Sequence, residues 1–308
     1  MAKIVGLAMV KNESDIIEAF VRHNLLYLDT MHIIDNDSID GTKEILVAMQ
    51  KEGLPITIYD DPGFGNFHSE RLTKLFHKVI PIEKPDYTFW LDADEFLLVE
   101  SRAKLEANLA MIPIGQVGLI QWKTFIPEPT KEPKQSIDPL RDIQYRRISE
   151  KGVYCHKSIA TSKLYNPSLV ISQGGHRMLD ASGREIPQTS MPDIWLGHFP
   201  IRSIEQLTMK AVVGWLAQVK RNKIQNTPGD WFQIHKLYDK IVYGGGVKQE
   251  DITDYTLQYA ANPVPNWTWP KDVVLDPATP NYTDLKYEHL IKYGALSKIV
   301  WTFERWIS

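Results

Sequence analysis

The stretch Phe89-Trp90-Leu91-Asp92-Ala93-Asp94-Glu95-Phe96 decides the fold. Residues 87–91 are aromatic and apolar on both sides of the strand alternation, which predicts a strand buried between two layers. Three carboxylates follow directly and stand at the C-terminal end of this strand, where open α/β sheets bind ligands. Asp92 and Asp94 face the same side of an extended backbone, so they can share one hard divalent cation. The alternative is an acidic turn that merely ends a strand.

Upstream of this strand, apolar segments alternate with helical patterns. Buried strands are predicted at residues 4–10, 31–34 and 56–59, and helices at residues 15–28 and 43–52. This alternation of strands and helices is typical of a parallel sheet with right-handed crossovers. Such a sheet forms the half of an α/β domain that binds a nucleotide. The sequence therefore predicts the α/β class.

A loop and a helix connect the third strand to the acids. Residues 60–67 form the loop, and its two glycines allow the backbone to approach a ligand closely. Arg71 follows on a helix predicted over residues 69–79. Its guanidinium suits diphosphate oxygens, and a surface ion pair is the equal alternative.

The pattern becomes mixed beyond the acids. A helix is predicted within residues 97–111, and strands at 117–124, 153–160 and 168–172. Residues 125–141 are rich in Pro, Lys and Glu and form a predicted loop, in the position of a lid over a ligand.

The last third of the chain is predicted to be mainly helical. Helical patterns cover residues 205–221 and 231–243, and a final helix is expected over 284–307. We therefore expect a domain over residues 1–206 and a helical extension over 207–308.

The apolar and basic stripe of residues 290–306 has two interpretations. It can pack onto the core, as the stripe of an ordinary surface helix does. Alternatively, it can lie on a membrane surface near a lipid-linked acceptor.

Composition narrows the class of partner. The chain of 308 residues is 43% hydrophobic and 24% charged, with a net charge of −3. It has no basic run, which argues against a nucleic-acid partner. No secretory-signal pattern or long apolar segment is present, so we expect a cytoplasmic protein, with peripheral contact to the inner membrane face as the variant. The lone Cys155 fits a reducing compartment.

Four motifs in order carry a resemblance to a known family. They are Met9-Val10-Lys11-Asn12-Glu13, Asp35-Asn36-Asp37-Ser38-Ile39-Asp40-Gly41-Thr42, Asp92-Ala93-Asp94-Glu95-Phe96 and Gly197-His198-Phe199-Pro200-Ile201-Arg202-Ser203-Ile204-Glu205-Gln206. With these motifs the chain resembles the family 2-like glycosyltransferases of GT-A fold, in the branch that includes the family 92-type enzymes. The resemblance covers about residues 3–206. It implies a Rossmann-like, mixed and mostly parallel sheet flanked by helices.

The resemblance also implies a reaction. A sugar would pass from a nucleotide-diphosphate sugar, most commonly a UDP-sugar, to a hydroxyl of a glycan or lipid-linked glycan acceptor. The nucleotide-sugar site would then comprise Val10, Asn12, Glu13, Asp35, Asn36, Arg71, Asp92 and Ala93.

A divalent metal, Mn²⁺ or Mg²⁺, belongs to the implied site. Asp94 would bind the metal directly, Asp92 would contact the ribose or reach the metal through water, and His198 would complete the metal site. A neutral imidazole beside carboxylates is a suitable Mn²⁺ ligand. A structural histidine that bonds nearby backbone is the alternative for His198.

Inverting transfer needs a carboxylate base opposite the leaving group. In the family the base comes from the later part of the domain, which makes Asp180, Glu185 and Asp193 the candidates. Asp180 is preferred because it is close to Gly175-His176-Arg177. The alternative for all three acids is simple solvation in polar turns.

Two other function classes compete. Sugar nucleotidyltransferases usually carry a glycine-rich basic loop after the first strand, whereas this chain has Lys11-Asn12-Glu13 there. A non-catalytic carbohydrate- or partner-binding module with the same fold is the other alternative. Asn36 stands where an Asp is frequent in the family, which leaves the base of the nucleotide open. The chain lacks the motifs of processive synthases, so we expect non-processive transfer.

Overall fold

The computed structural model describes residues 1–63, 67–129, 137–151, 156–225, 232–261, 266–280 and 282–292, without the side chains of 223–225, 232–234 and 249–250. Several expectations therefore lie outside the described residues in whole or in part. They concern Gly65 of the loop at 60–67, the middle of the proposed lid at 130–136, Cys155 with the start of the strand at 153–160, the first residue of the helix at 231–243, and the chain beyond residue 292.

The first half of the chain forms a parallel sheet. Its strands are β1 (Ile4–Val10), β2 (Thr30–Asp35), β3 (Ile56–Asp60) and β4 (Tyr87–Leu91). β1 lies between β2 and β4, and β3 pairs with the outer side of β2, all in parallel. All four strands therefore end at the same edge of the sheet, as the alternation of strands and helices predicts.

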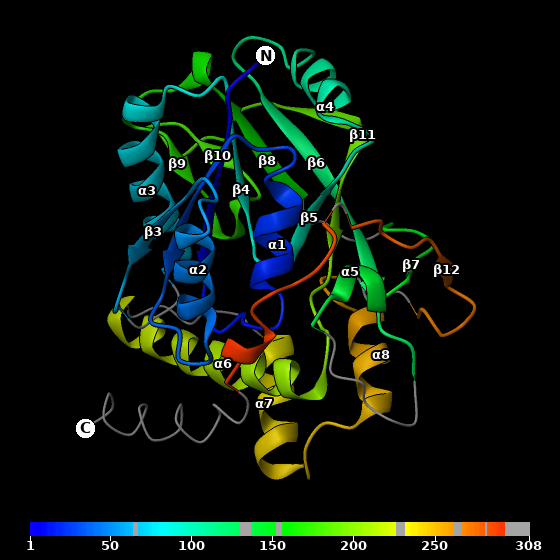
Figure 1. The fold of residues 1–308 in the computed structure, drawn as a ribbon. Helices are drawn as coiled ribbons and strands as arrows, with labels where there is room; N and C mark the ends of the chain where they lie inside the picture. Colours follow the sequence, from blue (N-terminus) through cyan, green and yellow to red (C-terminus); the bar gives the residue numbers. More distant parts are fainter. Residues whose placement is uncertain are drawn as a thin grey trace.

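Helices cover both faces of this parallel half. They are α1 (Ile17–Asn24), α2 (Thr42–Lys51) and α3 (His68–Glu83). Ile4 and Ala8 of β1 share a core with α1 and α2, whereas Val5 and Leu7 share a second core with α3. Successive side chains of a strand point to opposite faces, so the continuous apolar run of β1 follows from burial on both sides. Figure 1 shows α3 on one side of the sheet and α1 with α2 on the other.

The second half extends the same sheet with mostly antiparallel pairs. The added strands are β5 (Glu95–Leu98), β6 (Val117–Ile126), β7 (Tyr145–Arg147), β8 (His156–Thr161), β11 (Gln188–His198) and β12 (Val273–Leu275). β8 pairs antiparallel with both β4 and β6, while β11 runs parallel to β6 and antiparallel to β5. In the β5–β11 pair Glu95 lies opposite His198. This register brings the acidic turn and the later histidine to one edge of the sheet.

The remaining elements surround this sheet. Short helices α4 (Arg102–Leu109) and α5 (Pro139–Asp142) and a small pair of strands, β9 (Val170–Ile171) and β10 (Met178–Leu179), follow the acids. The later helices are α6 (Ile204–Gln225), α7 (Phe232–Tyr243) and α8 (Gln249–Leu257). Figure 1 shows α6 crossing the lower end of the sheet. The fold class is confirmed as a mixed α/β sheet flanked by helices with a mainly helical extension; α6 begins near the expected domain boundary at 206, and the division into two domains stays a prediction.

The final helix expected from residue 284 is wrong in its described part. Residues 282–292 contain only a short 3-10 turn, Glu288–Leu290. The backbone NH groups of Lys286 and Tyr287 donate to the Glu18 carboxylate of α1 instead of to a helical partner. This segment is therefore held along α1 by a side chain that the helical pattern does not reveal.

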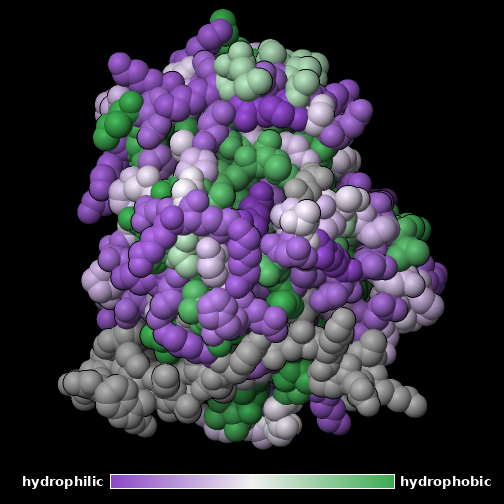
Figure 2. Space-filling model, viewed as in Figure 1, coloured by the Kyte–Doolittle hydropathy of each residue, from purple (hydrophilic) through white to green (hydrophobic). Residues whose placement is uncertain are grey.

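The surface in the view of Figure 2 is mainly hydrophilic, with apolar residues in small groups. Scattered apolar residues of this kind are normal on folded proteins. Among the described residues, no helix is both long and apolar enough to cross a membrane.

Candidate active site

Asp92 and Asp94 lie in the turn that joins β4 to β5. The NH of Glu95 donates to the Asp92 carbonyl oxygen at 3.0 Å, which closes the turn. The Asp92 carboxylate accepts a 2.6 Å hydrogen bond from Lys157 Nζ of β8 and lies 3.3 Å from His68 Nε2 of α3. Burial acts to raise the pKa of Asp92, but Lys157 and His68 outweigh it and hold that pKa well below its usual range. Asp92 is therefore ionised and already has a counter-ion.

Asp94 lies between β11 and α6. Its Oδ2 accepts a 3.0 Å hydrogen bond from Lys210 Nζ, and its Oδ1 lies 3.8 Å from His198 Nε2. The NH of Phe199 donates to the Asp94 carbonyl oxygen at 2.8 Å. Burial acts to raise the pKa of Asp94, but the Lys210 ammonium outweighs it and holds that pKa below its usual value. Both predicted partners, Asp94 and His198, are thus brought together at the end of the sheet.

His198 is a buried and neutral imidazole. Its ring stacks on Trp122 of β6 with centroids 3.9 Å apart and planes at 23°. Burial lowers the pKa of His198 to about 3, so the ring carries no proton charge at neutral pH. Its Nδ1 has no hydrogen-bond partner in the described structure. A neutral ring fixed by stacking can offer a nitrogen lone pair to a cation.

Glu95 supports the turn and is not free to act as a base. Its Oε1 accepts from Trp122 Nε1 at 2.8 Å, and its Oε2 accepts from the Asp92 NH at 2.9 Å. Lys157 lies 3.2 Å from the same Oε2. Burial raises the pKa of Glu95 to about 8, although Lys157 acts in the opposite direction. Its role in the structure is to hold Asp92 and Trp122 in place.

The ends of β1 and β2 meet at the same edge of the sheet. The NH of Asn36 donates to the Val10 carbonyl oxygen at 2.9 Å. Asn12 has a left-handed backbone with φ 56°, its NH donates to Ser38 Oγ, and its Oδ1 accepts from the Ile39 NH. These bonds fix the loop after β1 against the turn after β2, where the sequence places the nucleotide.

The side chains of Asp35 and Asn36 differ in their hydrogen bonding. Asp35 is buried, burial raises its pKa, and its Oδ1 has no hydrogen-bond partner in the described structure. Asn36 Nδ2 donates to the carbonyl oxygens of Asp61 and Gly63. Arg71 also donates to Gly63 and pairs with Asp61, so it lies beside Asn36. The nucleotide candidates from β1, β2 and α3 therefore form one group.

Arg202 ties this group to the acidic turn. Its guanidinium donates to Glu13 at 2.6 Å, to both Asp15 oxygens at 2.7 and 2.9 Å, and to the Phe199 carbonyl oxygen at 3.1 Å. Because Phe199 also donates to Asp94, one arginine connects the loop after β1 with the Asp94–His198 pair.

The three base candidates are not joined to this group. Asp180 accepts hydrogen bonds from Ser182 and Arg184 of its own turn, and the Ser182 hydroxyl and the Arg184 backbone lower its pKa to about 2. Glu185 pairs with Arg177 at 2.6 Å and Asp193 with Lys104 at 3.1 Å, at exposed positions. Within the described residues, no direct contact links any of these acids with Asp92, Asp94 or His198.

Asp94 and His198 fit a divalent cation better than the full predicted trio does. They present one oxygen and one neutral ring nitrogen to the same space, whereas Asp92 faces Lys157 and His68. No group of three Asp, Glu, His or Cys side chains at metal-binding spacing occurs in the described parts of the chain. Mg²⁺ and similar cations are commonly held by one or two protein groups plus substrate phosphates and water. The chemistry of the pair suits such a site.

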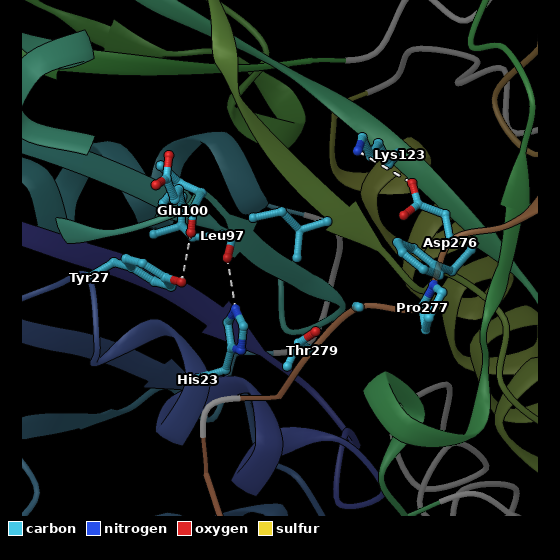
Figure 3. A pocket seen from close by; sticks show the side chains of 12 residues that line it. His23, Tyr27, Leu97, Glu100, Lys123, Asp276, Pro277 and Thr279 are labelled. Atoms are coloured by element: carbon cyan, nitrogen blue, oxygen red, sulfur yellow. Dashed lines mark hydrogen bonds and ion pairs between the residues drawn. The ribbon is translucent and has the colours of Figure 1, made fainter. Parts of the chain in front are cut away.

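A separate cavity of about 290 Å³ lies at the other end of β5. Figure 3 shows His23 of α1, and Tyr27 from the turn after α1, pointing toward β5, with Lys123 and Asp276 across the cavity. His23 Nε2 donates to the Leu97 carbonyl oxygen at 2.7 Å. None of the residues predicted for the nucleotide or metal lines this cavity, so the site is defined by its contacts and not by the cavity.

Four residues of the site carry no role in the sequence prediction. Three of them, Lys157, Lys210 and Trp122, lie within a strand or a helix and belong to no motif, so the sequence gives no signal for them. Arg202 lies within the Gly197–Gln206 motif, and that position was the signal by which the sequence could have identified it. Their carboxylate partners are 27 to 189 residues away in the chain, so only the fold identifies them.

Comparisons with known proteins were made at three levels. No family model matches the chain, and no curated protein matches it significantly. Among solved structures it is similar to the mannosyltransferase PcManGT from Pyrobaculum calidifontis, in complex with GDP-Man and Mn²⁺, with 17% identity and a TM-score of 0.32. That match covers 42% of this chain and 36% of the mannosyltransferase, about a third of its length.

Two further solved structures span more of the chain. TarS of S. aureus, residues 1–349, shares 14% identity over 84% of this chain and 78% of that one, with a TM-score of 0.39. A putative glucose-1-phosphate thymidylyltransferase from Bacillus anthracis shares 12% identity over 78% of this chain and 84% of that one, with a TM-score of 0.30. These identities and TM-scores are too low to assign a function, and the family 92-type branch stays a prediction.

Proposed function

We propose that the protein is a metal-dependent glycosyltransferase that moves a sugar from a nucleotide-diphosphate sugar to a hydroxyl of a glycan or glycolipid acceptor. The observation that carries the proposal is the meeting of Asp94 and His198 at the edge where the parallel strands end. Open α/β sheets bind ligands at that edge. Arg202 joins the loop after β1 to the same place, and that loop is hydrogen-bonded to the turn after β2.

The nucleotide would lie against the loops after β1 and β2. Val10, Asn12 and Glu13 supply one wall, and Asp35 and Asn36 supply the other. Asp35 has a buried Oδ1 without a hydrogen-bond partner in the described structure, and this atom could accept a hydrogen bond from the base or a ribose hydroxyl. UDP-sugars are the first donors to test.

The sugar diphosphate would lie toward the acidic turn, with Arg71, Asp92 and Ala93 along its path. Asp94 and His198 would hold Mn²⁺ or Mg²⁺, which acts as a Lewis acid on the leaving diphosphate when bound. Lys210 keeps Asp94 ionised, and burial keeps His198 neutral, so both groups are in the form that binds a cation. Trp122 fixes the imidazole plane by stacking.

Asp180 is the proposed base of an inverting, non-processive transfer, with Glu185 and Asp193 as alternatives. Its low pKa keeps the carboxylate ionised, as a proton acceptor requires, but also makes it a weak base. We expect Asp180→Asn to lower transfer and to leave donor binding unchanged. Equal transfer by Asp180→Asn and the wild type would remove Asp180 from the mechanism and leave Glu185→Gln and Asp193→Asn to be measured.

The test of the proposed function is nucleotide release from a panel of nucleotide-sugars with Mn²⁺, Mg²⁺ or EDTA. We expect release from one donor, dependent on metal and abolished in Asp94→Asn. Asp239→Asn, at a half-exposed carboxylate on α7 beside His235, is the matched control and should match the wild type. No release from any donor together with no metal-dependent thermal shift by UDP, GDP, CDP or dTDP would favour the non-catalytic binding module.

A further inference from the structure

Lys210 is the counter-ion of Asp94 in the free protein. Its Nζ donates to Asp94 Oδ2 at 3.0 Å and to the Pro200 carbonyl oxygen at 3.0 Å, and it lies 5.3 Å from the centre of the Tyr259 ring. The side chain reaches from α6 to the edge of the sheet and keeps 26% of its surface exposed. Lysine carries this charge on a flexible four-carbon stem, so the ammonium can move while the helix stays in place.

Lys157 is the matched case on the neighbouring acid, and its surroundings differ. Its Nζ contacts both Asp92 and Glu95, at 2.6 and 3.2 Å, and only 1% of the side chain is exposed. Moving Lys157 would deprive both Asp92 and the fully buried Glu95 of their cation, which is costly. Lys210 binds one carboxylate and borders solvent, so of these two ammonium groups it is the one that can change partner.

A divalent cation between Asp94 and His198 would create a conflict with Lys210. His198 faces Oδ1 of Asp94 and Lys210 occupies Oδ2, so both cations would share one carboxylate. A metal cation and an ammonium group on the two oxygens of one carboxylate repel each other strongly in a partly buried site. The ammonium then needs another anion, and the diphosphate of the proposed donor is the anion that arrives with the metal.

We propose that Lys210 is a diphosphate-binding residue that neutralises Asp94 in the free protein and transfers to a non-bridging diphosphate oxygen when metal and donor bind. This inference rests on the proposed function, because it requires a nucleotide diphosphate at this edge of the sheet. No covalent bond forms or breaks in the transfer. Through Lys210, helix α6 would contribute a positive charge to the donor site.

The inference predicts effects of opposite sign in Lys210→Gln. Without the competing ammonium, Mn²⁺ alone should bind roughly 10-fold more tightly. A nucleoside diphosphate in the presence of Mn²⁺ should bind roughly 10- to 100-fold more weakly, because a charge-assisted hydrogen bond is lost. The matching nucleoside monophosphate should lose less affinity, since it lacks the second phosphate. General damage to the fold would weaken the binding of Mn²⁺, of the diphosphate and of the monophosphate alike.

The measurements are Mn²⁺ binding by electron paramagnetic resonance and binding of UDP, GDP, CDP and dTDP by calorimetry, on wild type, Lys210→Gln and Lys3→Gln. Lys3 is the control because its Nζ pairs with Glu83 at 2.7 Å, at the opposite end of β1. Thermal melts confirm that each variant is folded.

Tighter Mn²⁺ binding together with weaker diphosphate binding, in Lys210→Gln alone, supports the inference. If the wild type binds a nucleoside diphosphate and Lys210→Gln binds it equally well, the inference is overturned and the proposed function stands. If the wild type binds none of the four nucleotides with or without Mn²⁺, the proposed function fails and the inference fails with it.

Discussion

Replacing Arg202 by methionine should destabilise the protein by about 3 kcal/mol. Arg202 is 3% exposed, and its guanidinium makes four hydrogen bonds to Glu13, Asp15 and the Phe199 carbonyl oxygen. Removing one partner of a buried ion pair typically costs about 3–5 kcal/mol. The lower end applies here because the two carboxylate side chains keep 20% and 14% of their surface exposed. Methionine preserves length and packing, so the change is mainly one of charge and hydrogen bonding.

The assay is urea unfolding at pH 7.5, with two companion variants. Arg202→Lys should fall between wild type and Arg202→Met, because one ammonium cannot replace the guanidinium fork. Adding Asp15→Asn to Arg202→Met should recover part of the loss, since it removes one unpaired charge. A free energy of unfolding for Arg202→Met within about 0.5 kcal/mol of wild type, the usual range of neutral surface changes, would refute the reasoning.

Two further predictions concern stability. Burial lowers the pKa of His23 to about 4, so the unfolded chain binds the proton first and the free energy of unfolding falls as the pH drops below about 6.5. Between pH 7.5 and 5.0, the free energy of unfolding of His23→Gln, measured in urea, should fall by about 2 kcal/mol less than that of wild type. An equal fall in both proteins would contradict this prediction. Gly175→Ala should cost about 3 kcal/mol, because the residue has φ +68° and an added Cβ would lie 2.2 Å from Trp90 Cδ1. Gly183→Ala, at φ +77° with open space, should cost only about 1 kcal/mol; thermal melts with equal losses at both positions would contradict the packing argument.

The parallel half of the sheet could be predicted because its signals are local. β1 and β4 are continuous apolar runs, and the turns that follow them carry the polar residues of the site. Such runs arise when a strand is buried on both faces, and both faces of this half are covered by helices.

β5 and β11, in contrast, could not be predicted from the local pattern. β11 contains Pro192 and polar residues, and its register with β6 shifts between Ser190 and Trp195. A proline and a register shift interrupt the alternation by which a strand is recognised. β5 begins with Glu95, a fully buried acid whose partners, Trp122 and Lys157, come from distant strands. Pairing across the fold decides these elements, and the local pattern does not contain it.

The candidate site was predictable in its acids and histidine and not in its cations. Asp92, Asp94 and His198 occur in motifs with recognisable order. Lys157 and Lys210 are single lysines within a strand and a helix, and solvated lysines give the same pattern. Their importance follows from 2.6 and 3.0 Å contacts with the two acids.

The central claim is that Asp94 and His198 form the metal site of the donor. Electron spin echo envelope modulation of bound Mn²⁺, with the nucleoside diphosphate that binds best, tests it most directly. We expect a nitrogen modulation from the histidine in wild type that disappears in His198→Gln while Mn²⁺ stays bound through the phosphates. Mn²⁺ bound to the wild-type protein without any nitrogen modulation would contradict the account.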